Sequence, residues 1–198
     1  MIKNIVLDVG GVLLDYRWKD MLMDYGLNEE TALIVGPEMF DDELWLQFDL
    51  DLLPAEEIIK KYEEKYPEHK DVIRWFITHG ELMHVPRQDV WKTVHELKEK
   101  GYGIYILSNY SEEFFRKHTG NASFIDDADG IVVSYQIHKA KPEKEIYLYL
   151  FEKYNLDPAE CIFFDDRLEN VEASNKLGMK SVQVTSKEMF LKELNNFK

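Results

Sequence analysis

The sequence predicts an α/β protein in which helices cover both faces of a parallel sheet and a helical subdomain interrupts the chain. Three observations predict this fold. Residues 5–7 form a short apolar strand of the kind that a parallel sheet buries on both faces. From Pro86 onward, strands and helices alternate along the chain. Between these parts, residues 16–85 have apolar residues at helical spacing and no convincing buried strand.

The composition indicates a single folded domain that has room for an insertion. The chain has 198 residues, of which 45% are hydrophobic, and its formal net charge is -14. This charge argues against a nucleic-acid partner, whose phosphates it would repel. No apolar run approaches the roughly 20 residues of a membrane helix, and no targeting segment is evident. We therefore expect a cytoplasmic protein that acts without a membrane.

Cysteine usage excludes two kinds of site. Cys161 is the only cysteine, so neither an intrachain disulfide nor a cysteine metal cluster can form. Its place within an apolar strand predicts a buried thiol, which is consistent with a reducing compartment.

The first strand leads directly into a candidate site. Asp8 follows residues 5–7, at the end of a strand where open parallel sheets bind their ligands. Gly10 and Gly11 follow at once, and because they lack a Cβ they allow a sharp turn and a close backbone approach to a ligand. A capped strand end with a tight turn would have the same sequence. Assigning Asp8 to a functional site therefore requires matching residues elsewhere in the chain.

The insertion is predicted to contain five helices. Its breaks fall at Gly26, at Gly36-Pro37 and at Pro67. The aromatic residues of these helices are expected to be packing residues: Trp45, Phe48, Trp75 and Phe76. The expected helices are 17–25, 28–35, 42–48, 54–66 and 68–78.

The second half of the chain predicts four further strands. They alternate with helices, which implies right-handed crossovers in one parallel sheet that also includes the first strand. The strands are expected at 103–107, 131–133, 162–164 and 181–184, and the helices at 86–100, 112–118, 143–154, 168–177 and 187–194.

Polar residues of a matching kind follow three of these strands. Asp8, Ser108-Asn109 and Asp165-Asp166 should share one edge of the sheet, together with Lys141 from a nearby loop. Clustered carboxylates and carbonyl oxygens favour Mg²⁺, and a hydroxyl, an amide and a lysine can hold phosphate oxygens. Asp8 would then be free to attack phosphorus and form an acyl phosphate. Taken singly, each residue could instead be a helix cap or a solvated charge.

Four segments, in order, resemble the motifs of the haloacid dehalogenase superfamily. They are residues 5–13 (IVLDVGGVL), 106–109 (ILSN), 141–147 (KPEKEIY) and 163–171 (FFDDRLENV). The resemblance covers nearly the whole chain. It implies a Rossmann-like three-layer catalytic core at 1–15 and 86–198, and a helical cap at 16–85.

The resemblance also implies roles for the site residues. Asp8 would be the nucleophile, while Ser108, Asn109 and Lys141 would contact phosphate, with the backbone of Gly10 and Gly11 close by. Mg²⁺ would be held by the carboxylates of Asp8 and Asp166 and the carbonyl of Gly10, with Asp165 as a helper. The expected substrate is a small phosphorylated metabolite, for example a sugar phosphate.

The sequence departs from the family pattern at Gly10. Phosphatases of this family carry an aspartate two positions after the nucleophile, where it protonates the leaving oxygen and later activates water. Three functions therefore stay open: a Mg²⁺-dependent phosphatase, a hydrolytic 2-haloacid dehalogenase that needs no metal, and a phosphoryl-binding protein without turnover. His84, His138 and Asp15 are candidates for the missing proton donor.

Arg17, Trp18 and Lys19 directly follow the first motif and could reach a substrate, or they could form a solvated hinge.

Overall fold

A computed structural model describes residues 1–197, and its centre is a five-stranded parallel sheet of order β5-β4-β1-β6-β7. The first strand of the chain is also the middle strand of the sheet, so that neighbours cover both of its edges. The five strands are β1 (Asn4–Leu7), β4 (Gly103–Ser108), β5 (Gly130–Val133), β6 (Cys161–Asp165) and β7 (Lys180–Gln183).

Residues of β1 alternate between two hydrophobic clusters, one on each face of the sheet. Ile5 and Leu7 belong to the larger cluster, whereas Val6 belongs to the smaller one, and all three are completely buried. This alternation follows from the two-residue period of a strand. It explains why the segment is apolar throughout rather than at every second position.

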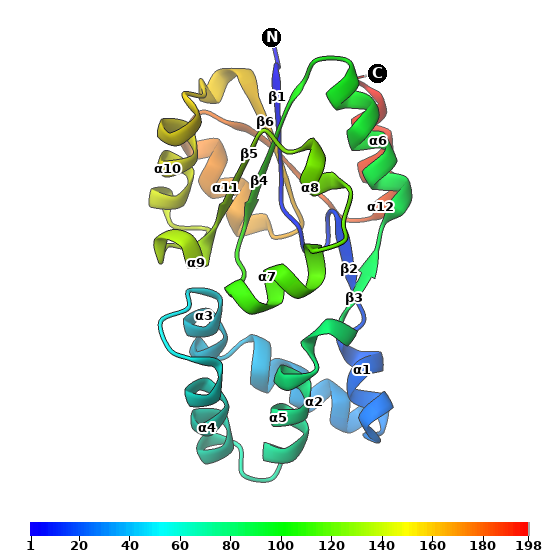
Figure 1. Ribbon diagram of the computed structural model, residues 1–198, viewed down its shortest axis with the longest axis vertical. Helices are drawn as coiled ribbons and strands as arrows, with labels where there is room; N and C mark the ends of the chain where they lie inside the picture. Colours follow the sequence, from blue (N-terminus) through cyan, green and yellow to red (C-terminus); the bar gives the residue numbers. More distant parts are fainter. Residues whose placement is uncertain (198) are drawn as a thin grey trace.

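Helices cover the two faces of the sheet, which completes three layers (Figure 1). The confirmed fold class is therefore the α/β class that the strand–helix alternation predicts. One face carries α6 (Gln88–Glu99), α8 (Phe124–Asp127) and α12 (Lys187–Asn195), and the other carries α9 (Ser134–Ile137), α10 (Lys144–Tyr154) and α11 (Leu168–Lys176). A short η2 (Pro158–Glu160) precedes β6.

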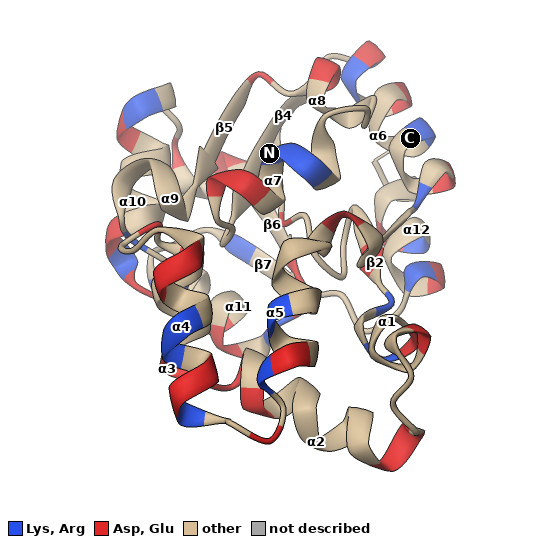
Figure 2. Cartoon of the chain, turned by 60° about the horizontal axis from the view of Figure 1, so that its bottom comes forward, with Lys and Arg blue, Asp and Glu red and all other residues tan. Residues whose placement is uncertain are grey.

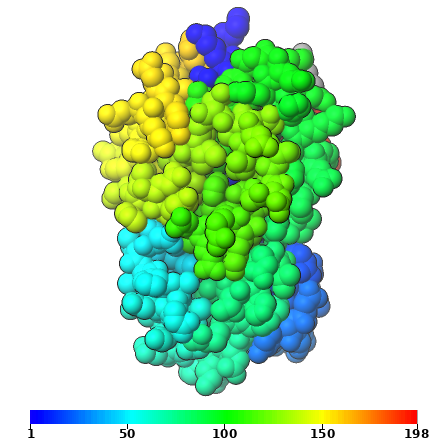
Figure 3. Space-filling model, viewed as in Figure 1, coloured from blue at the N-terminus to red at the C-terminus, as the bar shows by residue number. Residues whose placement is uncertain are grey.

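A helical lobe lies beyond the carboxyl ends of the strands (Figure 1). Its helices bury their apolar faces against one another and against α7 (Glu112–Thr119), and the space-filling view shows lobe and core in direct contact there (Figure 3). Within residues 1–197, no helix combines the length and the apolar character that crossing a membrane requires. The lobe consists of α1 (Trp18–Tyr25), α2 (Glu29–Phe40), α3 (Glu43–Asp49), α4 (Ala55–Lys65), α5 (Lys70–Thr78) and η1 (Gly80–Leu82).

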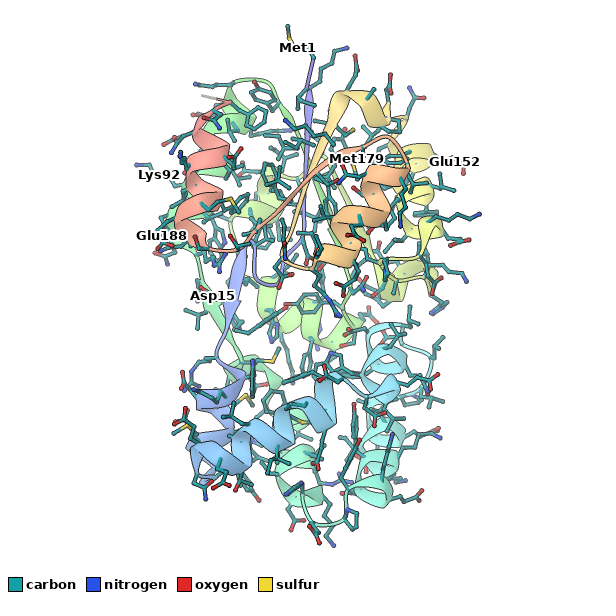
Figure 4. The ribbon with its side chains drawn as sticks, turned by 180° about the vertical axis from the view of Figure 1, so that it is seen from behind. Met1, Asp15, Lys92, Glu152, Met179 and Glu188 are labelled. Atoms are coloured by element: carbon teal, nitrogen blue, oxygen red, sulfur yellow. The ribbon has the colours of Figure 1, made fainter. Side chains whose placement is uncertain are left out.

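A two-stranded antiparallel ribbon joins the helical lobe to the core. Its strands are β2 (Leu14–Tyr16) and β3 (His84–Pro86), and Tyr16 is the register partner of His84. Figure 4 labels Asp15 at this junction. Three-residue strands have too few positions for a period to show, which is why the sequence did not predict them.

The predicted break at Gly36-Pro37 is wrong, because α2 continues through both residues to Phe40. The reason is tertiary packing. The ring of Trp18 lies so close to Gly36 that a Cβ there would be 2.9 Å from Cε3 of the indole. Glycine thus lets α1 and α2 approach each other, and this contact outweighs the weak helix propensity of the pair.

Charged residues of both signs are spread over the lobe and the core. Figure 2 shows basic residues interspersed among the more numerous acidic ones. The lone thiol of Cys161 is buried in β6, as expected, and burial raises its pKa to about 11.

Candidate active site

The carboxyl ends of β1 and β4 bring Asp8 and Ser108 together, with Lys141 beside them. The Ser108 hydroxyl donates to Oδ1 of Asp8 at 2.6 Å, and Nζ of Lys141 lies 2.8 Å from the same oxygen. All three side chains are buried. The register fixes this meeting, because β1 and β4 are parallel neighbours and Asp8 and Ser108 occupy the ends of their strands.

Lys141 is a buried cation with three acceptors. Besides Asp8, its Nζ contacts Oδ2 of Asp165 at 2.6 Å and donates to the carbonyl oxygen of Leu107 at 2.9 Å. Burial works to lower the pKa of Lys141, but the charges of Asp165 and Asp8 outweigh it and raise the pKa. Conversely, burial raises the pKa of Asp8 against the opposing charge of Lys141. The lysine therefore keeps its charge beside the candidate nucleophile.

Asp165 and Asp166 are adjacent but differ in their surroundings. Asp165 is completely buried, and both of its oxygens accept hydrogen bonds, from Lys141, from Asn170 and from the backbone N–H of Arg167. Asp166 is open to the pocket. Even so, loss of water around its carboxyl group, followed by the charges of Asp8 and Asp165, raises its pKa to about 7. Asp165 thus orients Lys141, and the carboxyl group of Asp166 borders the cavity.

The Gly10-Gly11 turn brings the backbone close to Asp166. Gly11 has φ +66°, and a Cβ there would lie 2.6 Å from Oδ2 of Asp166, so this position requires glycine on both counts. Arg87 holds the turn from behind. Its guanidinium donates to the carbonyl oxygens of Gly11 and Val12 at 2.7 and 3.1 Å, and to both oxygens of Asp15.

The sequence does not predict this role of Arg87, because the residue falls in the first turn of the helix expected at 86–100. Nothing in its local sequence signals a partner more than 70 positions earlier in the chain.

Asn109 is placed differently from the expected phosphate contact. Its side-chain amide donates to the carbonyl oxygen of Lys141 and accepts from the backbone N–H of Lys141, each at 2.9 Å. Both polar atoms therefore serve the loop that carries the lysine. Asn109 borders the pocket, but in this structure its side chain positions Lys141.

A cavity of about 310 Å³ opens above these groups, between the core and the helical lobe. Such a volume suits a small organic ligand. The core supplies a polar floor, and the lobe supplies a wall rich in aromatic rings. The lining residues are Asp8, Gly10, Tyr16, Trp18, Phe40, Trp45, Asp49, Met83, Ser108, Asn109, Tyr110, Phe114, Lys141, Asp166, Arg167 and Asn170.

The aromatic wall adds a second role to one predicted packing residue. Phe48 and Phe76 are buried as expected, and Trp45 packs against the core but also lines the cavity. Its ring meets Phe40 edge-on, with centroids 4.6 Å apart, and Phe40 in turn meets Trp18 at 5.6 Å. Edge-to-face contacts of this kind fix the rings relative to one another. The wall is therefore a preformed apolar surface.

The three residues after the first motif differ in placement. Trp18 lines the cavity, whereas Arg17 pairs with Asp24 at 2.5 Å and Lys19 pairs with Glu29 at 2.8 Å. Of the three, only Trp18 faces the space where a ligand would lie.

Two tyrosines and one aspartate add hydroxyl and carboxyl groups to the cavity. Tyr16 and Tyr110 share a hydrogen bond between their hydroxyls, and burial raises the pKa of both. Asp49, at the end of α3, has its pKa raised to about 8 by burial and by the charges of Asp51 and Asp8. All three groups therefore hold a proton near neutral pH.

The three expected proton donors lie elsewhere. Asp15 is paired with Arg87, His138 Nδ1 bonds to the carbonyl oxygen of Leu50 at 2.7 Å, and His84 Nδ1 is buried without a partner. Within the described chain, none of these three residues lines the cavity.

The chain resembles several curated proteins over most of its length. It is 25% identical to sesquiterpene phosphatase astK of Aspergillus oryzae over 92% of this chain and 90% of that protein. It is 26% identical to D-ribitol-5-phosphate phosphatase of Bacteroides thetaiotaomicron, over 92% of each. Drimenol cyclase drtB of Aspergillus calidoustus matches 99% of this chain at 26% identity, but the chain spans only 36% of that longer protein.

Solved structures share the fold. HAD family enzyme bt-2542 of Bacteroides thetaiotaomicron, in complex with magnesium and inorganic phosphate, superposes with a TM-score of 0.73 at 24% identity, over 92% of this chain and 94% of that one. A family model described as haloacid dehalogenase-like hydrolase matches residues 2–178, a span that holds all four motifs and the ends of β1, β4 and β6. With the motifs, the sheet order and this match in agreement, the chain belongs to the haloacid dehalogenase-like hydrolases.

Proposed function

We propose that the protein is a Mg²⁺-dependent phosphatase that hydrolyses a small phosphomonoester through an aspartyl phosphate on Asp8. One observation carries this proposal. Asp8 is a buried carboxylate at a strand end, with a hydroxyl at 2.6 Å, an ammonium at 2.8 Å and the carboxyl group of Asp166 close by. Relatives named as phosphatases support the same chemistry.

The carboxylates suit a divalent cation. Oxygen atoms of Asp8, Asp165 and Asp166 lie within 4.8 Å of one another, and burial, followed by the negative charges of Asp8 and Asp165, raises the pKa of Asp166. Because hydrogen bonds occupy Asp165, we assign the cation to Asp8 and Asp166, with the carbonyl of Gly10 as a third ligand. Bound Mg²⁺ would offset the charge of the phosphoryl group.

Side chains of the protein supply the nucleophile, the positive charge and a hydrogen-bond donor. Asp8 attacks phosphorus, and the bond between phosphorus and the leaving oxygen breaks as the acyl phosphate forms. Lys141 offsets the negative charge near Asp8, and its position is fixed by Asp165 and Asn109. Ser108 supplies a hydroxyl that can donate to a phosphate oxygen.

We further propose that the substrate carries an apolar organic group. The phosphate end of the cavity is polar, but Trp18, Phe40, Trp45 and Met83 form its opposite wall. A sugar would leave many hydroxyls facing these rings without partners, at a cost of roughly 1–3 kcal/mol each. The wall therefore favours an aromatic or hydrocarbon ester over a sugar phosphate. Residues 16–85 would act as a cap over the core formed by 1–15 and 86–198.

The alternatives make different demands on the site. A hydrolytic dehalogenase would use Asp8 on carbon without metal, and Asp166 would then add repulsive charge with no function. A phosphoryl-binding protein would hold phosphate without turnover. Both remain outcomes of the test below.

A panel of esters with and without Mg²⁺ tests the proposal. Benzyl phosphate and geranyl phosphate represent apolar esters, sorbitol 6-phosphate represents polar ones, and 2-chloropropionate tests dehalogenation. We expect Mg²⁺-dependent phosphate release, fastest from the apolar esters, and no release by Asp8→Asn, whose retained fold a melting curve checks. Chloride release without metal, or phosphate binding without hydrolysis, would contradict the proposal.

A further inference from the structure

Gly10 and Tyr16 compete for the same space. A Cβ built on Gly10 would lie 2.6 Å from Cε2 and 2.7 Å from Cζ of the Tyr16 ring, and would also overlap its hydroxyl. The backbone is not the constraint, because Gly10 has no positive φ, in contrast to Gly11. The Tyr16 hydroxyl thus occupies the place where a side chain two positions after Asp8 would begin.

Tyr16 ends β2 and lines the cavity that also holds Asp8. Its hydroxyl lies beside Gly10, two positions after Asp8. A tyrosine in such a wall offers a movable proton at the end of a rigid ring.

A chain of hydrogen bonds orients this proton at rest. Nε2 of His118 bonds to the carbonyl oxygen of Gly80 at 2.8 Å, so this nitrogen must carry a proton. Burial lowers the pKa of His118 to about 4, so that the ring is neutral and Nδ1 accepts from Tyr110 at 3.2 Å. Tyr110 has then used its proton, and its oxygen accepts from the Tyr16 hydroxyl.

The proposed reaction creates a demand for this proton. An alkoxide expelled from phosphorus is strongly basic and leaves slowly unless it is protonated as the bond breaks. A developing alkoxide is also a stronger acceptor than the neutral oxygen of Tyr110. Rotation about one C–O bond of Tyr16 is enough to redirect its hydrogen bond.

We propose that Tyr16 is the catalytic residue that donates a proton to the leaving oxygen, an inference that rests on the proposed phosphatase function. As Asp8 bonds to phosphorus, the bond to the leaving oxygen breaks, and the proton of Tyr16 moves to that oxygen. The Tyr110 hydroxyl can turn from His118 and stabilise the resulting phenolate. Water then attacks the acyl phosphate, its proton returns to Tyr16, and Asp8 is released as a carboxylate.

Asp49 is the rival donor in the same cavity. It belongs to α3 in the helical lobe, whereas Tyr16 lies against the turn that follows Asp8. Because Tyr16 lies close to that turn, we favour Tyr16 as the donor. The experiment below includes Asp49→Asn to test the alternative.

The test compares two esters of similar size, benzyl phosphate and 4-nitrophenyl phosphate. Nitrophenolate leaves readily without a proton, but benzyl alkoxide does not. Tyr16→Phe keeps the ring beside Gly10 and removes only the hydroxyl. We expect kcat/KM for benzyl phosphate to fall by roughly 10² to 10⁴, and that for 4-nitrophenyl phosphate by less than about tenfold. This kinetic constant covers every step up to expulsion of the leaving group.

Tyr62→Phe is the matched control. Its hydroxyl donates to the carbonyl oxygen of Met39 at 2.7 Å inside the helical lobe, away from the cavity, so both esters should react as in the unmodified protein. Asp49→Asn should likewise lack any selective loss for benzyl phosphate.

Two results would overturn the assignment while the phosphatase function stands. One is an equal loss for both esters in Tyr16→Phe, which would mean that the hydroxyl only positions the site. The other is a selective loss of benzyl phosphate turnover in Asp49→Asn without one in Tyr16→Phe. An unmodified protein that hydrolyses neither ester contradicts the proposed function itself, and the inference falls with it.

Discussion

The side chain of Asn109 binds the backbone of Lys141 at both ends of its amide, through two hydrogen bonds of 2.9 Å. The loop that carries the lysine is therefore held against the end of β4 by a residue that directly follows this strand. Lys141 in turn reaches Asp8 at 2.8 Å. A residue that contacts Lys141 rather than Asp8 thus decides where the buried cation lies.

Replacing Asn109 with alanine should displace Lys141 without removing it. The loss of two partly buried hydrogen bonds is expected to reduce the free energy of unfolding by roughly 1–3 kcal/mol. kcat should fall more than KM rises, because the charge next to Asp8 is misplaced while the cavity wall is intact. Chemical denaturation and steady-state kinetics check this, with Asn121→Ala on an exposed loop as the control. Unchanged kinetics in a destabilised variant would mean that Lys141 needs no such support.

Magnesium should raise the melting temperature, because it would bind the native carboxylates and not the unfolded chain. At a concentration 100 times its Kd, a ligand of this kind adds about 2.7 kcal/mol to the stability. Asp166→Asn should remove most of the response, whereas Asp126→Asn, an exposed acid outside the cavity, should leave it intact. Differential scanning calorimetry with Mg²⁺ and with EDTA measures the shift. The same response in both variants would place the cation elsewhere.

Asp49 should make the protein less stable as the pH rises. Its pKa is raised from 3.8 to about 8, so between these values the native state holds a proton that the unfolded chain has lost. Stability from this group is therefore lost progressively from about pH 4 to pH 8. Each pKa unit corresponds to about 1.4 kcal/mol, so even part of the shift is measurable.

Asp49→Asn should accordingly reduce the loss of stability with rising pH. The stability of the variant relative to the unmodified protein should be highest near and above pH 8. Asp41→Asn, on the exposed end of α2, serves as the control. Melting temperatures measured from pH 4 to pH 9 test this prediction. The same pH dependence in Asp49→Asn and the unmodified protein would show that the carboxyl group is charged throughout.

A side chain at position 10 should clash with Tyr16 and not with the backbone. Gly10→Ala is expected to destabilise the protein by about 1–3 kcal/mol, as overpacking does. In the double variant with Tyr16→Ala, the ring is gone and the penalty should largely disappear, which gives a coupling energy of the same size. Additive effects in this cycle would show that the two residues are independent.

The sequence predicted the parts of the site that depend on sheet topology. Asp8, Ser108 and the Asp165-Asp166 pair each follow a strand, and parallel strands end at a common edge whatever the details of their loops. The alternating pattern of strands and helices was therefore enough to predict that these residues lie close together. The same reasoning recovered the alternation of strands and helices from Pro86 onward.

What the sequence did not reveal depends on contacts across the fold. Whether Tyr16 fills the space beside Gly10 depends on how the turn and ribbon at 11–16 fold back, and no period encodes that path. Arg87 is similar, because its partners lie on a loop that precedes the whole helical lobe. Gly36 looked like a helix breaker, although it is the position at which Trp18 packs.

The aromatic wall gives the protein an optical probe of its own cavity. Of four tryptophans, Trp18 and Trp45 line the cavity, whereas Trp91 is buried with its Nε1–H bonded to the carbonyl oxygen of Leu13 at 2.6 Å and Trp75 is stacked on His79. A ligand that replaces water over the first two indoles shifts their fluorescence to shorter wavelengths, while the emission of the other two stays constant. Ligand binding can thus be titrated in the unlabelled protein, before any reaction takes place.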